Sequence, residues 1–222
     1  MKPALVLLSG GQDSATCLAW AKQEFGRVHT ISFHYGQRHS IEIDFAKKLS
    51  ELAEVESFTV LDVPLFKLGD SALFGNGNVL IPHRSGGDLP ATFVPGRNMV
   101  FLALAAAQAF KLGLHHLVGG MCQTDFSGYP DCRDGSIKAV QVAASLCLDY
   151  PIYIHTPLMW KMKAQTVLMM KDLGRLDWYK YTHTCYEGQR PPCGKCPACR
   201  LREKGFEVVG IKDPLLEEDC GK

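Results

Sequence analysis

A glycine-rich turn near residue 10 is the feature that most constrains how this chain folds. Before it, residues 4–8 are all apolar, which is typical of a strand buried on both faces of a parallel sheet. After it, a helical pattern begins at Ala15. A helix that starts directly after a strand points its unpaired N–H groups and its positive dipole end at the carboxyl edge of the sheet. The turn therefore predicts an α/β sheet with an anion-binding site at that edge.

The residues of the turn, Ser9-Gly10-Gly11-Gln12-Asp13-Ser14, suit a phosphate. The two glycines allow the backbone to approach an anion closely and to adopt positive φ. The two serine hydroxyls add donors, and the Asp13 carboxylate can orient groups or hold Mg²⁺. No lysine follows the second glycine, so the turn is not a Walker loop. A tight strand-to-helix turn that binds nothing is the alternative interpretation.

Strand and helix patterns alternate through the rest of the chain. Besides the first strand and helix, the sequence predicts strands at 28–33, 57–63, 117–120 and 152–156 and helices at 40–53, 98–112, 136–148 and 163–173. This alternation predicts an α/β fold with an open, doubly wound parallel sheet. We expect the alanine-rich helix 98–112 to be buried on most sides, with Asn98 as its N-cap. Residues 66–95 are expected to form a long loop that either covers a ligand or is a solvent-side excursion.

Length and composition limit how the chain is organised. With 222 residues there is room for one sizeable α/β domain and a small appendage, which we place at residues 1–177 and 178–222. The formal net charge of +1 provides no broad field for nucleic acid, so no direct nucleic-acid partner is expected. No apolar run is long enough to cross a bilayer, and no secretory leader pattern precedes the first strand. We therefore expect a cytoplasmic location and no membrane partner.

Four of the nine cysteines cluster near the C-terminus, at Cys185, Cys193, Cys196 and Cys199. The C-x-x-C spacings place thiolates around one ion, and four thiolates complete a tetrahedral site of the kind that structural zinc prefers. The surrounding segment is rich in Pro and Gly and has little core of its own. A metal would therefore contribute on the order of 10 kcal/mol to its folding. An iron–sulfur cluster and a redox C-x-x-C pair are the alternatives.

Three further sets of polar residues stand at the ends of expected strands and helices. Arg97 would project from the start of helix 98–112, where it can pair with phosphate or carboxylate, and a plain surface arginine is the alternative. Lys163 opens a helix, which is an unfavourable place for a cation unless it faces a ligand. The segment after strand 117–120 can be a simple turn, or it can hold a planar heterocycle through its carboxylates, aromatics and arginine. Those side chains are Asp125, Phe126, Tyr129, Asp131 and Arg133.

Taken together, these segments resemble one enzyme family. The Ser-Gly-Gly-x-Asp-Ser turn alone is similar to the pyrophosphate loop of the ATP pyrophosphatase superfamily, whose members cleave ATP between the α- and β-phosphates. Matching stretches follow in family order at residues 33–39, 92–98, 124–133, 156–163 and 184–202. They include Phe-Val-Pro-Gly-Arg-Asn, Asp-Phe-Ser-Gly-Tyr-Pro-Asp-Cys-Arg and the four-cysteine tail. With these the chain resembles the 7-cyano-7-deazaguanine synthases, a family of queuosine-precursor biosynthesis.

The resemblance implies an ATP-dependent C–N ligase. The substrate 7-carboxy-7-deazaguanine would be adenylated by Mg-ATP and converted to the amide by ammonia. A second ATP would adenylate the amide oxygen, and loss of AMP would give the nitrile. Free ammonium is the expected nitrogen source. The resemblance also implies a homodimer, and the implied cofactors are ATP, Mg²⁺ and one structural Zn²⁺.

The implied site residues come from the same segments. Those expected to bind ATP are Leu8, Ser9, Gly10, Gly11, Gln12, Asp13, Ser14, Ala15, Thr16, Cys17 and Leu18. Within this set, Ser9, Asp13 and Ser14 are expected to hold the departing pyrophosphate, where negative charge develops. Arg97 and Lys163 are candidates for binding phosphate or carboxylate. The deazaguanine base would lie against residues 124–133, with Asp131 accepting from its N–H edge.

Two other functions fit parts of the sequence. A tRNA-base-modifying ligase or thiolase of the same superfamily would use the same turn, but such enzymes usually carry RNA-binding parts for which this length leaves no room. A non-catalytic zinc-ribbon module would need neither the turn nor the sheet. Small departures from the family pattern occur at Gln123 and Gln165, which stand where relatives often carry acids. ATP consumption without RNA would separate the enzyme from both alternatives.

Overall fold

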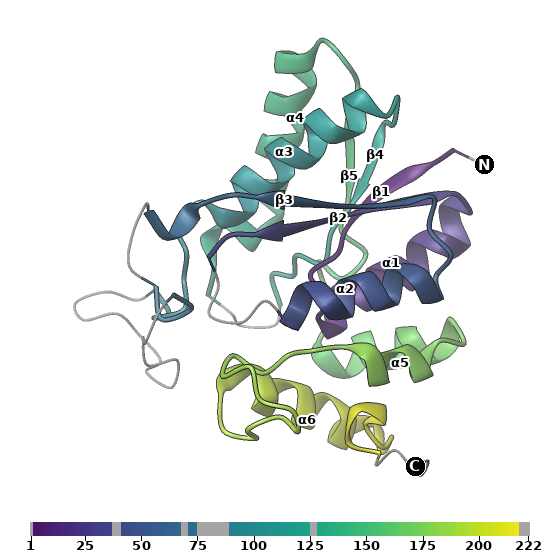
Figure 1. Cartoon of the computed structure of the whole chain (residues 1–222), viewed down its shortest axis with the longest axis vertical. Coiled ribbons are helices and arrows are strands. Elements are labelled where there is room, and N and C mark those ends of the chain that lie inside the picture. Colours follow the sequence, from purple (N-terminus) through teal and green to yellow (C-terminus); the bar gives the residue numbers. More distant parts are fainter. Residues whose placement is uncertain (1, 37–40, 68–70, 75–88, 125–127, 218–222) are drawn as a thin grey trace.

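The computed structural model describes residues 2–36, 41–67, 71–74, 89–124 and 128–217, and a five-stranded parallel sheet forms its centre (Figure 1). The strands are β1 (Ala4–Leu7), β2 (Val28–His34), β3 (Ser57–Asp62), β4 (His116–Val118) and β5 (Tyr153–His155). The helices are α1 (Gln12–Phe25), α2 (Ile41–Leu52), α3 (Arg97–Lys111), α4 (Asp134–Leu148), α5 (Lys163–Asp172) and α6 (Pro197–Val209). Short 3-10 helices lie at Leu65–Lys67, Pro130–Cys132, Leu176–Tyr181 and Pro214–Leu216.

The strand order β3-β2-β1-β4-β5 places β1 at the centre of the sheet. Ala4 pairs with Val28 on one side and with His116 on the other, and all strand pairs are parallel. The chain moves outward from β1 to β3 and then returns to the other side of β1 with β4 and β5. Open α/β sheets bind ligands in the crevice where the strand order reverses, here at the carboxyl ends of β1 and β4. The predicted α/β class and doubly wound parallel sheet are confirmed.

Helices cover both faces of the sheet (Figure 1). Helices α1 and α2 bury Ala4 and Val6 on one face, whereas α3 and α4 bury Leu5 and Leu117 on the other. Successive residues of β1 thus enter different apolar clusters, because side chains alternate along a strand. Helices α5 and α6 form a further layer outside α1 and α2 (Figure 1).

Helix α3 is amphipathic, so the prediction that it is buried on most sides is wrong. Leu102, Ala105 and Ala109 are buried against the sheet, but Met99 is 54% exposed and Phe110 is 49% exposed. Alanine suits both environments, so the alanine-rich sequence did not reveal which side of the helix faces outward. Neither α3 nor any other helix in the described part of the chain is long and apolar enough to cross a membrane.

The N-terminus of α3 is capped from another segment, so the prediction that Asn98 is its N-cap is also wrong. The helix begins at Arg97, directly after Gly96, which has φ 69°. The Asn98 N–H group donates to the Asp131 carboxylate at 2.9 Å. The carboxylate therefore satisfies an otherwise unpaired amide and lies at the positive end of the helix dipole.

The segment after residue 177 contains a helix that periodicity did not predict. Helix α6 begins with Pro197, which suits a first helical turn, and it buries both Phe206 and the charged Arg202. Because Cys199 and the charged Arg202 occupy buried positions of α6, the sequence lacks the regular apolar spacing that predicts a helix. Phe206 belongs to the same apolar cluster as Leu18 of α1 and Val167 of α5, so this segment packs on the helices that cover the sheet. The division into domains at residues 177 and 178 stays a prediction.

A buried ion pair between Arg202 and Asp213 stabilises the C-terminal segment. Arg202 donates to the two Asp213 carboxylate oxygens at 2.6 and 2.8 Å. The same guanidinium donates to the hydroxyls of Thr182 and Thr184 at 2.8 and 2.9 Å. Because both charges are paired and the arginine's donors are used, burial of this pair is tolerated. The network holds residues 182–184, which lead into the cysteines, against α6.

Candidate active site

A cavity of about 670 Å³ opens where the strand order reverses. Its walls come from the turn after β1, the starts of α2, α3 and α5, the segment after β4, and the cysteine-rich segment before α6. The volume is usual for a small-molecule site. All five residues that the sequence analysis assigns to pyrophosphate, phosphate or carboxylate line it, namely Ser9, Asp13, Ser14, Arg97 and Lys163.

The turn after β1 is closed by its own hydroxyl groups. Ser14 Oγ donates to the Gly11 carbonyl at 3.0 Å and lies 3.1 Å from Ser9 Oγ. Gly10 has φ +82°, and a Cβ there would lie 2.2 Å from the carbonyl oxygen of Glu42, so only glycine fits. Helix α1 starts after Gly11 without a side-chain cap, which leaves N-terminal amides for an anion. The turn has the geometry that a phosphate site requires.

The last four residues of the predicted ATP-binding run lie inside α1. Ala15, Thr16, Cys17 and Leu18 are all fully buried. Thr16 Oγ1 lies 2.6 Å from the Tyr179 hydroxyl, which joins α1 to the C-terminal segment. Burial raises the pKa of the Cys17 thiol well above its ordinary value, so this thiol stays protonated. These side chains support the turn from the core, and their part in nucleotide binding stays a prediction.

Lys163 and Asp13 form an ion pair at the turn. Lys163 Nζ donates to both Asp13 carboxylate oxygens, at 2.8 and 2.7 Å. The lysine is the first residue of α5, where the helix dipole disfavours a cation, and the aspartate offsets that cost. Gly205 of α6 allows this placement, since a Cβ there would lie 2.7 Å from Lys163 Cγ. The pair places an ammonium group beside the predicted phosphate site.

Arg97 brings a second cation to the cavity. Its Nη1 donates to the Tyr35 hydroxyl at 3.5 Å, and its guanidinium carbon lies 5.7 Å from the ring centres of both Tyr35 and Tyr129. Such cation–π contacts hold a guanidinium in place. The Tyr129 hydroxyl lies 2.6 Å from Thr92 Oγ1. Arg97 is therefore a cation held in place by Tyr35 and Tyr129, and it can bind a planar carboxylate or a phosphate.

Of the other residues predicted to bind the base, only some lie at the cavity in the described part of the chain. Tyr129 lines the cavity, and Asp131 caps α3 through Asn98 as described above. Arg133 is exposed and precedes α4. Asp125 and Phe126 lie outside the described residues. The base-binding role of this set stays a prediction.

Glu42, on the second residue of α2, also lines the cavity, and the sequence analysis missed it. Burial raises the pKa of Glu42 to about 7, and the Arg97 guanidinium offsets this only in part. Burial also raises the pKa of Tyr35, which lies nearby. In sequence Glu42 is one of several acids on an amphipathic helix, and such acids ordinarily face solvent. No signal in the sequence alone separates it from its neighbour Asp44.

His183 is a second residue that the sequence analysis missed. Its backbone N–H group donates to the Gly10 carbonyl at 2.8 Å, and its imidazole Nε2 lies 2.9 Å from the Cys185 carbonyl oxygen. The imidazole stacks on Phe45 of α2 at a ring separation of 5.9 Å. His183 therefore connects the turn after β1, α2 and the first of the clustered cysteines.

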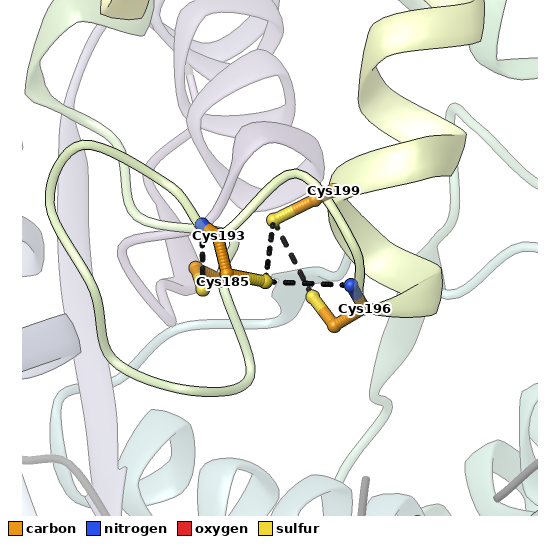
Figure 2. Close-up of side chains that lie close together, drawn as sticks. All are labelled: Cys185, Cys193, Cys196 and Cys199. Carbon is orange, nitrogen blue, oxygen red and sulfur yellow. Dashed lines mark hydrogen bonds between the residues drawn. The ribbon is translucent and has the colours of Figure 1, made fainter. Parts of the chain in front are cut away.

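The four predicted metal ligands converge, as Figure 2 shows. Their sulfur atoms all lie within 4.8 Å of one another. Cys199 Sγ is 3.4 Å from Cys196 Sγ and 3.9 Å from Cys193 Sγ. A tetrahedral ion with bonds of about 2.3 Å to sulfur holds its ligands ~3.8 Å apart. The sulfur atoms of these four cysteines are therefore spaced as such an ion requires.

Backbone amides support thiolates in this cluster. The N–H groups of Lys195 and Cys196 donate to Cys193 Sγ at 3.4 and 3.3 Å, and the Cys193 N–H donates to Cys185 Sγ at 3.5 Å. Such donors orient thiolate ligands and lower their charge density. Four thiolates leave no coordination position for water or substrate, which is typical of a structural metal.

Solved structures of low sequence identity have a similar fold. NMN synthetase from Francisella tularensis superimposes with a TM-score of 0.53 and 16% identity, over 94% of this chain and 77% of that chain. A 4-thiouridine synthetase, solved as an RNA complex with bound ATP, superimposes with a TM-score of 0.51 and 18% identity, over 94% of this chain and 50% of that chain. At these identities the likeness concerns the fold alone.

Much closer relatives share one name. A protein of Chromobacterium violaceum is 50% identical over 220 residues, which are 96% of this chain and 93% of the relative. A protein of Bacillus subtilis (strain 168) is 49% identical over 207 residues, which are 92% of this chain and 93% of the relative. Both are named 7-cyano-7-deazaguanine synthase. The family model described as "Queuosine biosynthesis protein QueC" matches residues 3–210, and the chain therefore belongs to this family.

Proposed function

We propose that this protein is an ATP-dependent C–N ligase that converts 7-carboxy-7-deazaguanine and ammonia into 7-cyano-7-deazaguanine. One observation carries the proposal: the phosphate-binding turn, the Lys163–Asp13 pair and Arg97 all face one cavity. Activation of a carboxylate by a nucleotide needs both reactants held together in a space that limits water. The name of the relatives at 49% and 50% identity supports this choice of substrate.

The first stage gives the carboxylate a good leaving group. A carboxylate oxygen of the substrate attacks the α-phosphorus of ATP, and pyrophosphate departs. We assign to the turn Ser9–Ser14, the start of α1 and Lys163 the stabilisation of the negative charge that develops on pyrophosphate. Mg²⁺ suits the Asp13 carboxylate beside a phosphate site, and when bound it would neutralise phosphate charge.

In the later stages, nitrogen replaces both carboxylate oxygens on the substrate carbon. Ammonia displaces AMP to give the amide, the amide oxygen attacks a second ATP, and loss of the second AMP leaves the nitrile. We assign Arg97 to the substrate carboxylate and Tyr129 to the face of the heterocycle. We assign the N–H edge of the base to Asp131 Oδ1, because Oδ2 already accepts from the Asn98 amide.

We assign a single structural Zn²⁺ to the four cysteines. Four thiolates favour zinc, and they stay reduced in the cytoplasm, where we place the enzyme. Cys185 also lines the cavity, together with Tyr186. The metal would therefore hold one wall of the active site in place without contacting a reacting atom.

Product analysis tests the proposed reaction. The zinc-loaded protein is incubated with Mg-ATP, ammonium and 7-carboxy-7-deazaguanine, and products are followed by mass spectrometry and ³¹P NMR. The expected products are the nitrile, AMP and pyrophosphate. AMP and pyrophosphate without nitrile would mean that the acceptor is wrong, and tRNA would then be tried. Absence of ATP turnover by folded protein would contradict the enzyme assignment itself.

The role of Lys163 predicts a large kinetic effect of Lys163→Gln. The substitution removes the cation beside the departing pyrophosphate and leaves Asp13 unpaired at the phosphate site. We expect kcat/KM for AMP release to fall about 100-fold or more. Lys171→Gln, at an exposed position of the same helix, is the matched control and should behave like the wild type. Wild-type rates in a folded Lys163→Gln protein would contradict the role.

The role of the cysteines predicts that Cys196→Ser loses the metal. Elemental analysis should find about one zinc per wild-type chain and almost none in the variant. Because metal binding drives folding of this segment, we also expect a lower Tm and weaker ATP binding. Cys147→Ser, at an exposed position outside the cluster, should keep both. Iron in place of zinc in the wild type would support the iron–sulfur alternative.

We also propose that two copies of the chain associate through α3 and α4, which pack side by side (Figure 1). Their outer surface exposes Met99, Phe110, Val142 and Leu146, the last to 76%. Neither residues 98–110 nor residues 139–148 include a charged side chain. Two such surfaces can therefore meet around a two-fold axis without burying charge.

Solution mass tests the dimer. Sedimentation at micromolar concentration should give twice the chain mass of 24.5 kDa. Leu146→Glu should give a folded monomer, since it places a carboxylate in the contact. Leu168→Glu, at a position on α5 that is 41% exposed, should remain dimeric. A monomeric wild type, or a dimeric Leu146→Glu protein, would refute the proposal.

A further inference from the structure

The position of Glu42 is fixed by the phosphate-binding turn. The Glu42 carbonyl oxygen packs so closely on Gly10 that a Cβ at Gly10 would lie 2.2 Å from it. The first turn of α2 is therefore held against the turn that receives the nucleotide. From this anchored backbone, the Glu42 side chain forms part of the cavity wall. The turn therefore sets the backbone position from which this carboxyl group reaches the cavity.

Among the described residues that line the cavity, the two carboxylates are Glu42 and Asp13. Asp13 is committed to Lys163 through both of its oxygens. For Glu42, by contrast, no hydrogen bond or ion pair occurs within the described part of the chain. Asp131, just outside the cavity wall, accepts from the Asn98 amide. Of the two described carboxylates that line the cavity, Glu42 is thus the one without a hydrogen bond or ion pair to another described residue.

Several groups face Glu42 from the elements around it. Among the described residues, Arg97 at the start of α3 is a nearby cation, and Tyr35 after β2 is a nearby phenol. Tyr129, His183 and the Lys163–Asp13 pair line other parts of the same cavity. Burial outweighs the effect of Arg97 and raises the pKa of Glu42 to about 7. A carboxyl group with such a pKa both accepts and releases protons near neutral pH.

The proposed reaction must remove protons from nitrogen at two stages. When ammonia attacks the acyl adenylate, its nitrogen becomes positively charged, and it loses one proton as the C–O bond to AMP breaks and the amide forms. After the amide oxygen has displaced pyrophosphate, the nitrogen carries two protons and a positive charge. Loss of both protons, with cleavage of the C–O bond to AMP, leaves the C≡N bond. No oxidant or reductant is involved, because every leaving group takes its electron pair.

We propose that Glu42 is the general base that takes these nitrogen-bound protons. This inference rests on the proposed function, because it presumes adenylated acid and amide intermediates. The carboxylate would contact the reacting nitrogen, and Arg97 would stand beside it at the substrate carboxylate. Protons taken by Glu42 pass to water when AMP leaves.

The amide itself, supplied as substrate with Mg-ATP, gives the cleanest test, because ammonium is then not needed. Nitrile release is measured by mass spectrometry, and adenylation is measured separately as amide-dependent exchange of labelled pyrophosphate into ATP. For Glu42→Gln we expect exchange within a few-fold of the wild type and nitrile release at least about 100-fold slower. Asp44→Asn, on the exposed side of the same helix, is the control and should match the wild type in both assays.

The pH profile is a further readout that a purely structural role would not change. Since a base acts when deprotonated, wild-type nitrile release should rise as the pH increases through about 7 and then level off. This rise should be missing in Glu42→Gln. Glu42→Asp keeps a carboxylate, so it should retain the rise at a reduced rate, and it serves also where Glu42→Gln folds poorly.

Three results would overturn the inference. One is nitrile release by Glu42→Gln within a few-fold of the wild type. Another is an equal loss of exchange and nitrile release in a folded variant, which would place Glu42 in binding or adenylation. The third is a Glu42→Asp protein without the pH-dependent rise. A wild-type protein that makes no nitrile from the amide would instead contradict the proposed function.

Discussion

The backbone of Gly10 is the point at which three parts of the chain meet. Because Gly10 has no Cβ, α2 approaches so closely that a Cβ would lie 2.2 Å from the Glu42 carbonyl oxygen. The Gly10 carbonyl accepts from the His183 amide at 2.8 Å. The turn after β1 therefore determines where α2 starts and where the cysteine-rich segment runs. Packing of the fold and shaping of the anion site depend on the same residue.

This junction brings the cysteine-rich segment to the cavity. Cys185 and Tyr186 line the cavity, and His183 lies between them and the turn. On the far side of the segment, Arg202 and Asp213 hold it against α6 and the last described residues. A closed set of four thiolates cannot take part in the chemistry through an open position. In the proposed function it would keep one wall rigid, which lowers the cost of orienting two reactants in the cavity.

Features with a local physical cause could be predicted from the sequence. The apolar strands, the turn Ser9–Ser14 and the four cysteines each follow from periodicity, glycine placement or spacing, and the parallel sheet follows from their alternation. Features set by distant partners could not. The cap on α3 comes from Asp131, some thirty residues further along the chain. Glu42 differs from Asp44 only through the burial that Gly10 and the cavity impose on it.

The proposed reaction requires both oxygens of the substrate carboxylate to leave as part of AMP. The direct measurement is turnover of an acid labelled with ¹⁸O at both carboxylate oxygens, in unlabelled water, with AMP and pyrophosphate analysed by ³¹P NMR and mass spectrometry. This requirement predicts two AMP molecules for each nitrile, each with one ¹⁸O, and no label in pyrophosphate. Label in pyrophosphate, or a labelled oxygen in only one of the two AMP molecules, would contradict it.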